Sequence, residues 1–182
     1  TKEVLKLIRS SLPTTIEIHD SSISDALVMA DPTQIHQVLM NLCTNAGHAM
    51  QKEGGILAID LTDVRLDSDF VSTHPDIKAG TFLKLTVRDT GHGIAPDILD
   101  NIFDPFFTTK KKSEGTGLGL SVVHGIVKGL DGTIIVNSEP QKGTEFNVYL
   151  PAIEHEAKEE RVIEAPLPKG NERILFVDDE KS

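Results

Sequence analysis

The chain has 182 residues, of which 38% are hydrophobic and 25% are charged, and this composition is typical of a soluble globular protein. Its length fits one packed domain of about 150 residues with extensions. A net charge of -10 argues against a nucleic-acid-binding surface, which requires clustered lysine and arginine. No apolar run approaches the ~18 residues of a membrane span, so this fragment is expected to contact neither nucleic acid nor membrane.

The single cysteine, Cys43, cannot form an internal disulfide bond. The N-terminus carries no basic and hydrophobic secretion signal. A reducing, cytoplasmic compartment is therefore expected, and membrane association of a longer protein stays open.

The N-terminal third of the chain alternates between helix and strand signals. Residues 1–12 place apolar side chains at helical spacing and end before Pro13, which predicts the end of a helix. Residues 14–20 (TTIEIHD) and 26–30 (ALVMA) are typical of short strands. Asp31 followed by Pro32 is typical of a helix start, and this helix is expected to run to about Gln51.

The middle and end of the chain predict two strand pairs separated by a long irregular segment. Residues 56–66 and 81–89 alternate and predict a hairpin-like pair with a loop between them. Residues 91–116 are mostly irregular, with one short helix at PDILDNIF, and a loop of this length is usually functional. A helix over 117–130 precedes a second pair, GTIIVNS and GTEFNVYL. This order predicts a mixed α and β domain with helices covering one face of the sheet.

The predicted helix that follows Asp31 carries a polar stripe beside its apolar face. On a helical wheel, the core-facing residues are Ile35, Val38, Leu39, Leu42, Ala46 and Ala49. The neighbouring stripe consists of Gln34, Gln37, Asn41, Asn45 and His48. A solvated flank is the simplest interpretation, but such flanks usually carry lysine and glutamate. Two asparagines four residues apart can instead offer carbonyl oxygens to one Mg²⁺ ion, and His48 can contact a phosphate.

Asp89 ends a strand whose alternation places it on the buried side, with Leu85 and Val87. It is either a turn-forming aspartate or an acceptor for an exocyclic amine such as that of adenine, with Gly91 and Gly93 allowing a flat ring to approach. The dinucleotide-binding and Walker glycine loops are both absent. The run GTGLGL at a helix start instead offers free amides and the positive end of a helix dipole to phosphates.

Four segments, NLCTNAGHAM, DTGHGI, FDPFFTTK and GTGLGL, occur in this order. Together they resemble the four boxes of the ATP-binding catalytic domain of sensor histidine kinases, within the wider group that includes type II topoisomerases, mismatch-repair ATPases and heat-shock chaperones. The resemblance covers residues 13–151. It implies a two-layer α/β sandwich with a mixed, largely antiparallel sheet, helices on one face and a long lid over ATP. The implied cofactors are ATP and Mg²⁺.

The resemblance also assigns roles to single residues. Asn45 matches the principal Mg²⁺ ligand, with Asn41 beside it, and His48 stands where many relatives have a phosphate-contacting lysine. Asp89 matches the acceptor for the adenine amine. The residues expected to bind ATP are Asn41, Asn45, His48, Asp89, Gly91, Gly93, Ile94, Phe107, Lys110, Gly115, Thr116, Gly117, Leu118, Gly119 and Thr144. For Lys110, Lys111 and Lys112, a hydrated charge run is the alternative.

The resemblance also divides the chain. Residues 1–12 match the end of an upstream dimerisation helix, and residues 152–172 form a glutamate-rich linker. Residues 173–182 (RILFVDDEKS) resemble the first strand of a receiver domain, with Asp178 and Asp179 as part of its Mg²⁺ pocket. These features imply a hybrid kinase whose partners are an upstream phosphoacceptor domain and a receiver domain.

None of the seven histidines has the HExxxP-like setting of a phosphoacceptor. The fragment therefore contains no catalytic acceptor, which the resemblance places upstream of Thr1. One alternative is an ATP-driven clamp of the same superfamily, but Asn41 stands where such enzymes carry the hydrolytic glutamate. A module that binds partners and no nucleotide is the other alternative.

Overall fold

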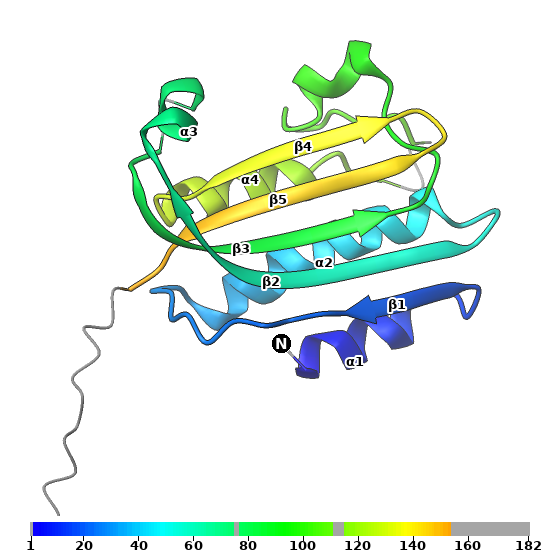
Figure 1. Cartoon of the computed structure of the whole chain (residues 1–182). Coiled ribbons are helices and arrows are strands. Elements are labelled where there is room, and N and C mark those ends of the chain that lie inside the picture. Colours follow the sequence, from blue (N-terminus) through cyan, green and yellow to red (C-terminus); the bar gives the residue numbers. More distant parts are fainter. Residues whose placement is uncertain (1, 75–76, 111–114, 154–182) are drawn as a thin grey trace, which may run out of the picture.

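The structure is a computed structural model, and it describes residues 2–74, 77–110 and 115–153 (Figure 1). The predicted linker over 152–172, apart from Ala152 and Ile153, lies outside the described residues, as do the predicted receiver strand over 173–182 and both Lys111 and Lys112. No helix in the described ranges is long and apolar enough to cross a membrane.

One mixed sheet forms the first of the two layers of the domain (Figure 1). Its strands are β1 (Ile16–Asp20), β2 (Gly55–Leu66), β3 (Gly80–Asp89), β4 (Thr133–Glu139) and β5 (Gly143–Pro151). Their order across the sheet is β1-β2-β3-β5-β4. β1 runs parallel to β2, and all other neighbours are antiparallel. Both predicted strand pairs are confirmed, and the sheet is mixed and largely antiparallel as expected.

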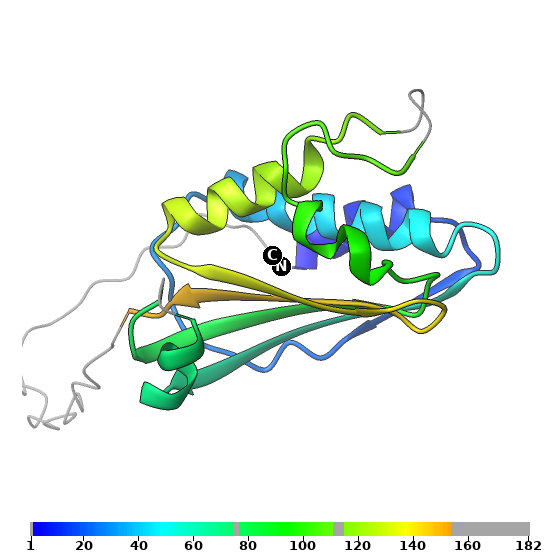
Figure 2. The same cartoon turned by 90° about the horizontal axis from the view of Figure 1, so that it is seen from above.

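The helices form a second layer on one face of the sheet (Figure 2). This layer holds α1 (Lys2–Ser11), α2 (Pro32–Ala49) and α4 (Gly119–Gly129). Asp31 caps α2 as predicted, because its carboxylate accepts a 2.7 Å hydrogen bond from the Thr33 amide. A short 3-10 helix, η1 (Pro96–Asn101), lies within the irregular segment. The two-layer architecture predicted from the sequence is confirmed.

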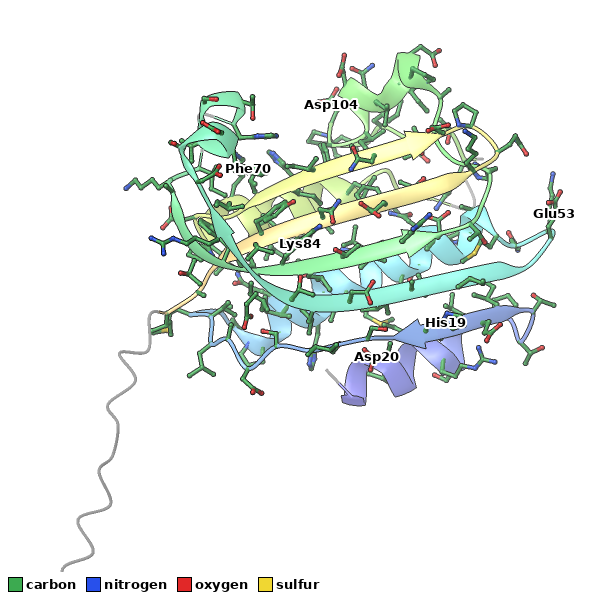
Figure 3. The ribbon with its side chains drawn as sticks, viewed as in Figure 1. His19, Asp20, Glu53, Phe70, Lys84 and Asp104 are labelled. Atoms are coloured by element: carbon green, nitrogen blue, oxygen red, sulfur yellow. The ribbon has the colours of Figure 1, made fainter. Side chains whose placement is uncertain are left out.

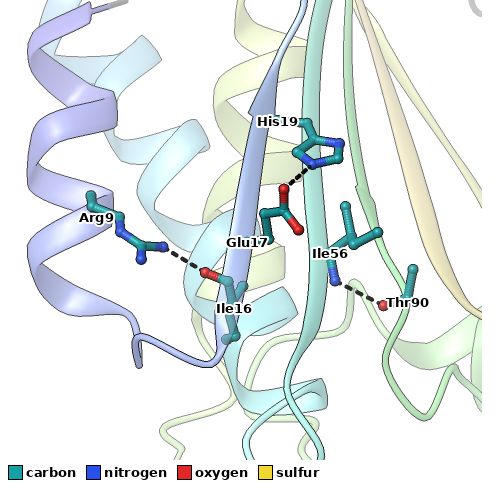
Figure 4. A network of polar contacts seen from close by, with 6 residues as sticks. All are labelled: Arg9, Ile16, Glu17, His19, Ile56 and Thr90. Carbon is teal, nitrogen blue, oxygen red and sulfur yellow. Dashed lines mark hydrogen bonds and ion pairs between the residues drawn. The ribbon is translucent and has the colours of Figure 1, made fainter.

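The core lies between α2, α4 and the sheet. From the predicted core face of α2, Val38, Leu39, Leu42 and Ala46 are buried, whereas Ile35 and Ala49 are half-buried. The four buried residues and Ile35 pack in one cluster with sheet residues such as Ile59, Val87 and Val148. Arg9 anchors α1 to the sheet by donating a hydrogen bond to the carbonyl of Ile16 in β1 (Figure 4).

Two predicted segments are corrected. The loop predicted between the first two long strands contains α3 (Ser68–Thr73), which Asp67 caps by accepting a 3.0 Å bond from Phe70. Six residues are too few for a periodic signal, and a helix this short depends on tertiary packing. That packing comes from Phe70, whose ring centroid lies 5.4 Å from that of Tyr149. The helix that carries Phe70 (Figure 3) lies on the face of the sheet opposite the other helices (Figure 2).

The predicted strand over 26–30 is also wrong. In the described part of the chain, this segment forms a single antiparallel bridge, between Val28 and Ala152. Leu27 and Met29 on either side of it are 52% and 81% exposed, so the alternating pattern has no second sheet layer to cover it. The bridge lies just past the end of β5, where Ile153 also donates a 2.8 Å hydrogen bond to the carbonyl of Leu27.

Cys43 supplies a reporter of folding. It is 1% exposed on the buried face of α2, and burial raises the pKa of its thiol to about 12. Because the thiolate is the reactive species, iodoacetamide at pH 8 should modify the native chain far more slowly than the chain in denaturant. Mass spectrometry of timed samples measures both rates, and equal rates would contradict the burial of this thiol.

Candidate functional site

A cavity of about 600 Å³ opens between α2, the end of β3 and the segment that leads into α4. Its walls bring together residues far apart in the sequence, from Asn41 on α2 to Phe146 on β5. Among the predicted site residues, all but Gly91 and Leu118 line it, namely Asn41, Asn45, His48, Asp89, Gly93, Ile94, Phe107, Lys110, Gly115, Thr116, Gly117, Gly119 and Thr144. The four sequence boxes therefore meet in one place.

Gly91 and Leu118 do not line the cavity. Gly91 is buried against the end of α2, where an added Cβ would lie 2.7 Å from the backbone carbonyl carbon of Ala49. Its absence of a side chain serves close packing of β3 under α2. Leu118 immediately precedes α4, and its carbonyl accepts a 2.9 Å bond from Ser121. Its side chain is 38% exposed.

Asp89 reaches the cavity from the last position of β3 and is only 4% exposed. The strand alternation that buries Leu85 and Val87 also carries this carboxylate inward. One of its oxygens accepts a 2.8 Å hydrogen bond from the Gly91 amide. Burial nevertheless raises its pKa above the ordinary aspartate value, against the lowering effect of bonds from the Gly91 and Thr144 backbone. A buried carboxylate of this kind is suited to accept hydrogen bonds from a ligand.

The end of β3 is held on both sides. Next to Asp89, the hydroxyl of Thr90 accepts a 3.0 Å bond from the Ile56 amide of β2 (Figure 4). On the β5 side, Thr144 contacts the hydroxyl of Ser138 at 2.9 Å. Because Ser138 donates its one proton to the carbonyl of Gly143, Thr144 donates to Ser138. Thr144 is thus fixed in the cavity wall.

Sequence reasoning missed Ser138 and most of the apolar wall. Ser138 also accepts a 2.8 Å bond from the Ile94 amide, which ties the start of the irregular segment to β4. Apolar side chains that line the cavity but were not predicted are Ala46, Ala49, Ile98, Ile102, Leu120 and Phe146. Ile98 lies within η1 and Ile102 is the residue that ends it, so this short helix carries part of the apolar wall.

At the other end of the cavity, the amides of the polar stripe meet the start of α4. An added Cβ at Gly119 would lie 3.5 Å from Oδ1 of Asn41 and 3.9 Å from Nδ2 of Asn45. Lys110 donates a 3.0 Å hydrogen bond to Oδ1 of Asn45. His48 lies on the same helix face and lines the cavity. Gln34 and Gln37, the first members of the predicted stripe, do not line it.

These residues fit a magnesium ion held partly by a ligand. In the described ranges, no cluster of three or more histidine, cysteine or acidic side chains could hold a metal. The oxygens available are neutral amides, and Oδ1 of Asn45 already accepts from a cation, the Lys110 ammonium. Mg²⁺ keeps several waters and takes one or two protein ligands beside substrate phosphates, so such a donor set suits it.

Gly93 and Gly117 bound the irregular segment, and both have a left-handed backbone, with φ of 69° and 68°. A Cβ at Gly93 would overlap the carbonyl oxygen of Glu139, the last residue of β4. At Gly117, it would overlap the backbone of Phe106, whose amide donates a 2.9 Å bond to the Gly117 carbonyl. Glycine at these positions lets the segment pack closely at both ends.

Gly93→Ala is expected to lower the free energy of unfolding by about 2 kcal/mol or more, because left-handed strain and overlap with backbone add. The matched control is Gly125→Ala in α4, where an added Cβ meets nothing within 4 Å. That change should stabilise the helix by about 0.5–1 kcal/mol. Urea unfolding of the three proteins measures both effects, and a neutral Gly93→Ala would contradict the strained turn.

The chain belongs to the histidine kinase-, DNA gyrase B- and HSP90-like ATPase family, whose model matches residues 30–154. Within this family its similarity is to histidine kinases. A solved catalytic domain of histidine kinase ThkA is 30% identical, with a TM-score of 0.65 over 82% of this chain and 88% of that one. The mycobacterial sensor histidine kinase MprB, at 23% identity and a TM-score of 0.64, covers 83% of this chain and 91% of that chain and shares the fold.

Two curated relatives extend this similarity. Sensor kinase CckA of Brucella abortus is 40% identical over 162 residues, which cover 84% of this chain. Sensor histidine kinase ZraS of Escherichia coli K12 is 42% identical over 124 residues, or 68% of this chain. The chain spans only 17% and 23% of the lengths of these relatives. The domain is thus the ATP-binding catalytic domain of a sensor histidine kinase.

Proposed function

We propose that this domain binds ATP together with Mg²⁺ and presents the γ-phosphoryl group to a histidine on a dimerisation domain of a longer sensor kinase. The observation that carries the proposal is the two-ended cavity. One end holds the buried carboxylate of Asp89, and the other holds the amides of Asn41 and Asn45 with the ammonium of Lys110. A molecule with a neutral amine-bearing ring at one end and phosphates at the other matches this arrangement.

The base end of the cavity suits adenine. Asp89 can accept a hydrogen bond from the exocyclic amine of adenine. Guanine carries a carbonyl oxygen at that position, which is an acceptor and cannot donate to the carboxylate. The apolar side chains of Ile94, Ile98 and Phe146 would cover the faces of the ring. Thr144 offers its hydroxyl oxygen at the same end, where Ser138 fixes its direction.

The phosphate end relies on backbone and cations. The segment from Gly115 to Gly119 lines the cavity where α4 begins, so its amides and the positive end of the helix dipole would be available to phosphates. Lys110 and His48 line the same end. Asn45 and Asn41 would hold Mg²⁺, which when bound supplies neutralisation of phosphate charge. The protein's contribution to transfer is positioning and electrostatic stabilisation.

The whole protein is proposed to be an ATP-dependent protein-histidine kinase of the hybrid type, working in a two-component phosphorelay. Two sequence features support this proposal: no histidine here has a phosphoacceptor setting, and residues 173–182 resemble the start of a receiver domain. Its partners would be the upstream phosphoacceptor domain and a receiver. The clamp alternative is disfavoured because Asn41 replaces the hydrolytic glutamate, and steady phosphate release without an acceptor would favour it.

Thermal unfolding of the chain tests nucleotide binding. At a nucleotide concentration of about 100 times Kd, the native state gains about 2.7 kcal/mol, so ATP with Mg²⁺ should raise Tm by several degrees. ITP is the matched control, because its ring has an oxygen in place of the exocyclic amine. Absence of a shift with Mg²⁺ and ATP would contradict the proposal. An equal shift with ITP would refute the role of Asp89.

A further inference from the structure

A lysine from the irregular segment already holds one of the site amides. Nζ of Lys110 donates a hydrogen bond of 3.0 Å to Oδ1 of Asn45, and the two residues lie 65 positions apart in the chain. Both side chains are half-buried and line the cavity. The ammonium therefore occupies an oxygen that the proposed function assigns to Mg²⁺.

The backbone around Lys110 shapes a place for this side chain. An added Cβ at Gly115 would lie 3.1 Å from Cδ of Lys110 and 3.2 Å from Oγ1 of Thr108. That hydroxyl in turn accepts a 3.1 Å bond from the Lys110 amide. The stem of the lysine thus passes over a position without a side chain, and its own backbone is held by a neighbouring threonine. The packing of the stem over Gly115 and the backbone bond to Thr108 both support the direction of the Lys110 side chain toward Asn45.

Two cations cannot share this oxygen. Mg²⁺ binds oxygen ligands at about 2.0–2.1 Å, and an ammonium donor lies at about 2.8–3.0 Å. Both on Oδ1 of Asn45 would bring three positive charges within about 4 Å of one another, and like charges at that distance repel. Binding of Mg²⁺ to Oδ1 of Asn45 therefore requires release of the Lys110 ammonium from that oxygen.

We propose that Lys110 is a positioning residue that reserves Oδ1 of Asn45 in the nucleotide-free domain and exchanges with the divalent cation. The inference rests on the proposed function, because it takes the same oxygen as the metal ligand. When the cation takes Asn45, the ammonium of Lys110 is released at the phosphate end of the cavity. Metal loading and delivery of this charge to the phosphates are thereby coupled through one amide.

Mn²⁺ titration of the nucleotide-free chain tests the exchange. Mn²⁺ is a paramagnetic substitute for Mg²⁺, and its binding is followed by broadening of the Asn45 side-chain amide in NMR spectra. Loss of that signal in Asn45→Ser identifies it. In Lys110→Met, the Mn²⁺ concentration at half-maximal broadening should fall roughly three- to tenfold. This is the size expected for removing one competing, solvent-accessible charge-assisted hydrogen bond.

The control is Lys112→Met, which removes the same charge from the same basic run. An equal fall in this variant would mean a general charge effect and would overturn the proposal. The proposal is also overturned if the Mn²⁺ concentration that broadens the Asn45 signal is the same in wild type and Lys110→Met. It is likewise overturned if Mn²⁺ broadens that signal in neither protein. A wild type that gains Tm with ATP but shows no Lys110 effect refutes only the exchange. A wild type without that gain refutes the proposed function.

Discussion

Asp89→Asn is expected to weaken ATP binding roughly 10- to 100-fold, the range for losing a hydrogen bond to a charged group. The carboxylate is 4% exposed at the base end of the cavity. Asparagine keeps the shape but presents an amine toward the amine of adenine if its oxygen continues to accept from Gly91. Isothermal titration calorimetry in the presence of Mg²⁺ measures the loss, and unchanged affinity would contradict the assignment.

The same variant should change how stability depends on pH. Burial raises the pKa of Asp89 in the folded chain, so its carboxyl group binds protons more tightly folded than unfolded. Its contribution to stability is present in full below the unfolded value of about 3.9. It is lost as pH rises through the folded pKa. As pH rises through this range, the free energy of unfolding of Asp89→Asn should therefore increase relative to that of wild type.

Urea unfolding at several pH values between 3.5 and 7.5 measures this difference. The charge-matched control is Asp60→Asn on β2, whose side chain is on the face of the sheet away from the cavity. The control should bind ATP as wild type does. A difference between Asp89→Asn and wild type that stays constant with pH would contradict the raised pKa.

Asn45→Ala is expected to weaken ATP binding roughly 10- to 100-fold in Mg²⁺, within the range reported for disturbing a metal site. In EDTA the variant and wild type should differ much less, because the amide oxygen then serves no metal. Asn45 lines the cavity and contacts Lys110. Calorimetry in both conditions provides the comparison.

Gln37→Ala is the matched control for Asn45. It removes an amide from the same polar stripe of α2, but Gln37 is exposed and does not line the cavity. It should leave the affinity unchanged in Mg²⁺ and in EDTA. An Asn45→Ala variant that loses the same affinity in both conditions would instead assign Asn45 to a direct contact with the nucleotide.

Several features of the fold and site could be predicted because they depend on local patterns. Alternation placed Asp89 on the buried side of β3, and its exposure of 4% confirms this. The capping signal of Asp31 and Pro32 located the start of α2. Other features had no local signal: α3 forms because Phe70 packs on Tyr149, which lies in β5. Over 26–30, where a strand was predicted, the described residues form only the bridge between Val28 and Ala152, and this contact joins segments far apart in the sequence.

By itself, the sequence determined the strand pairs, the helix carrying the amides and the order of the four boxes, because strand and helix periodicity are properties of neighbouring residues. Only the tertiary structure decided which members of each pattern share the cavity. It separates Gln34 and Gln37 from Asn41 and Asn45. It also brings Lys110 onto Asn45. Such contacts depend on how distant segments pack, and no local pattern encodes that packing.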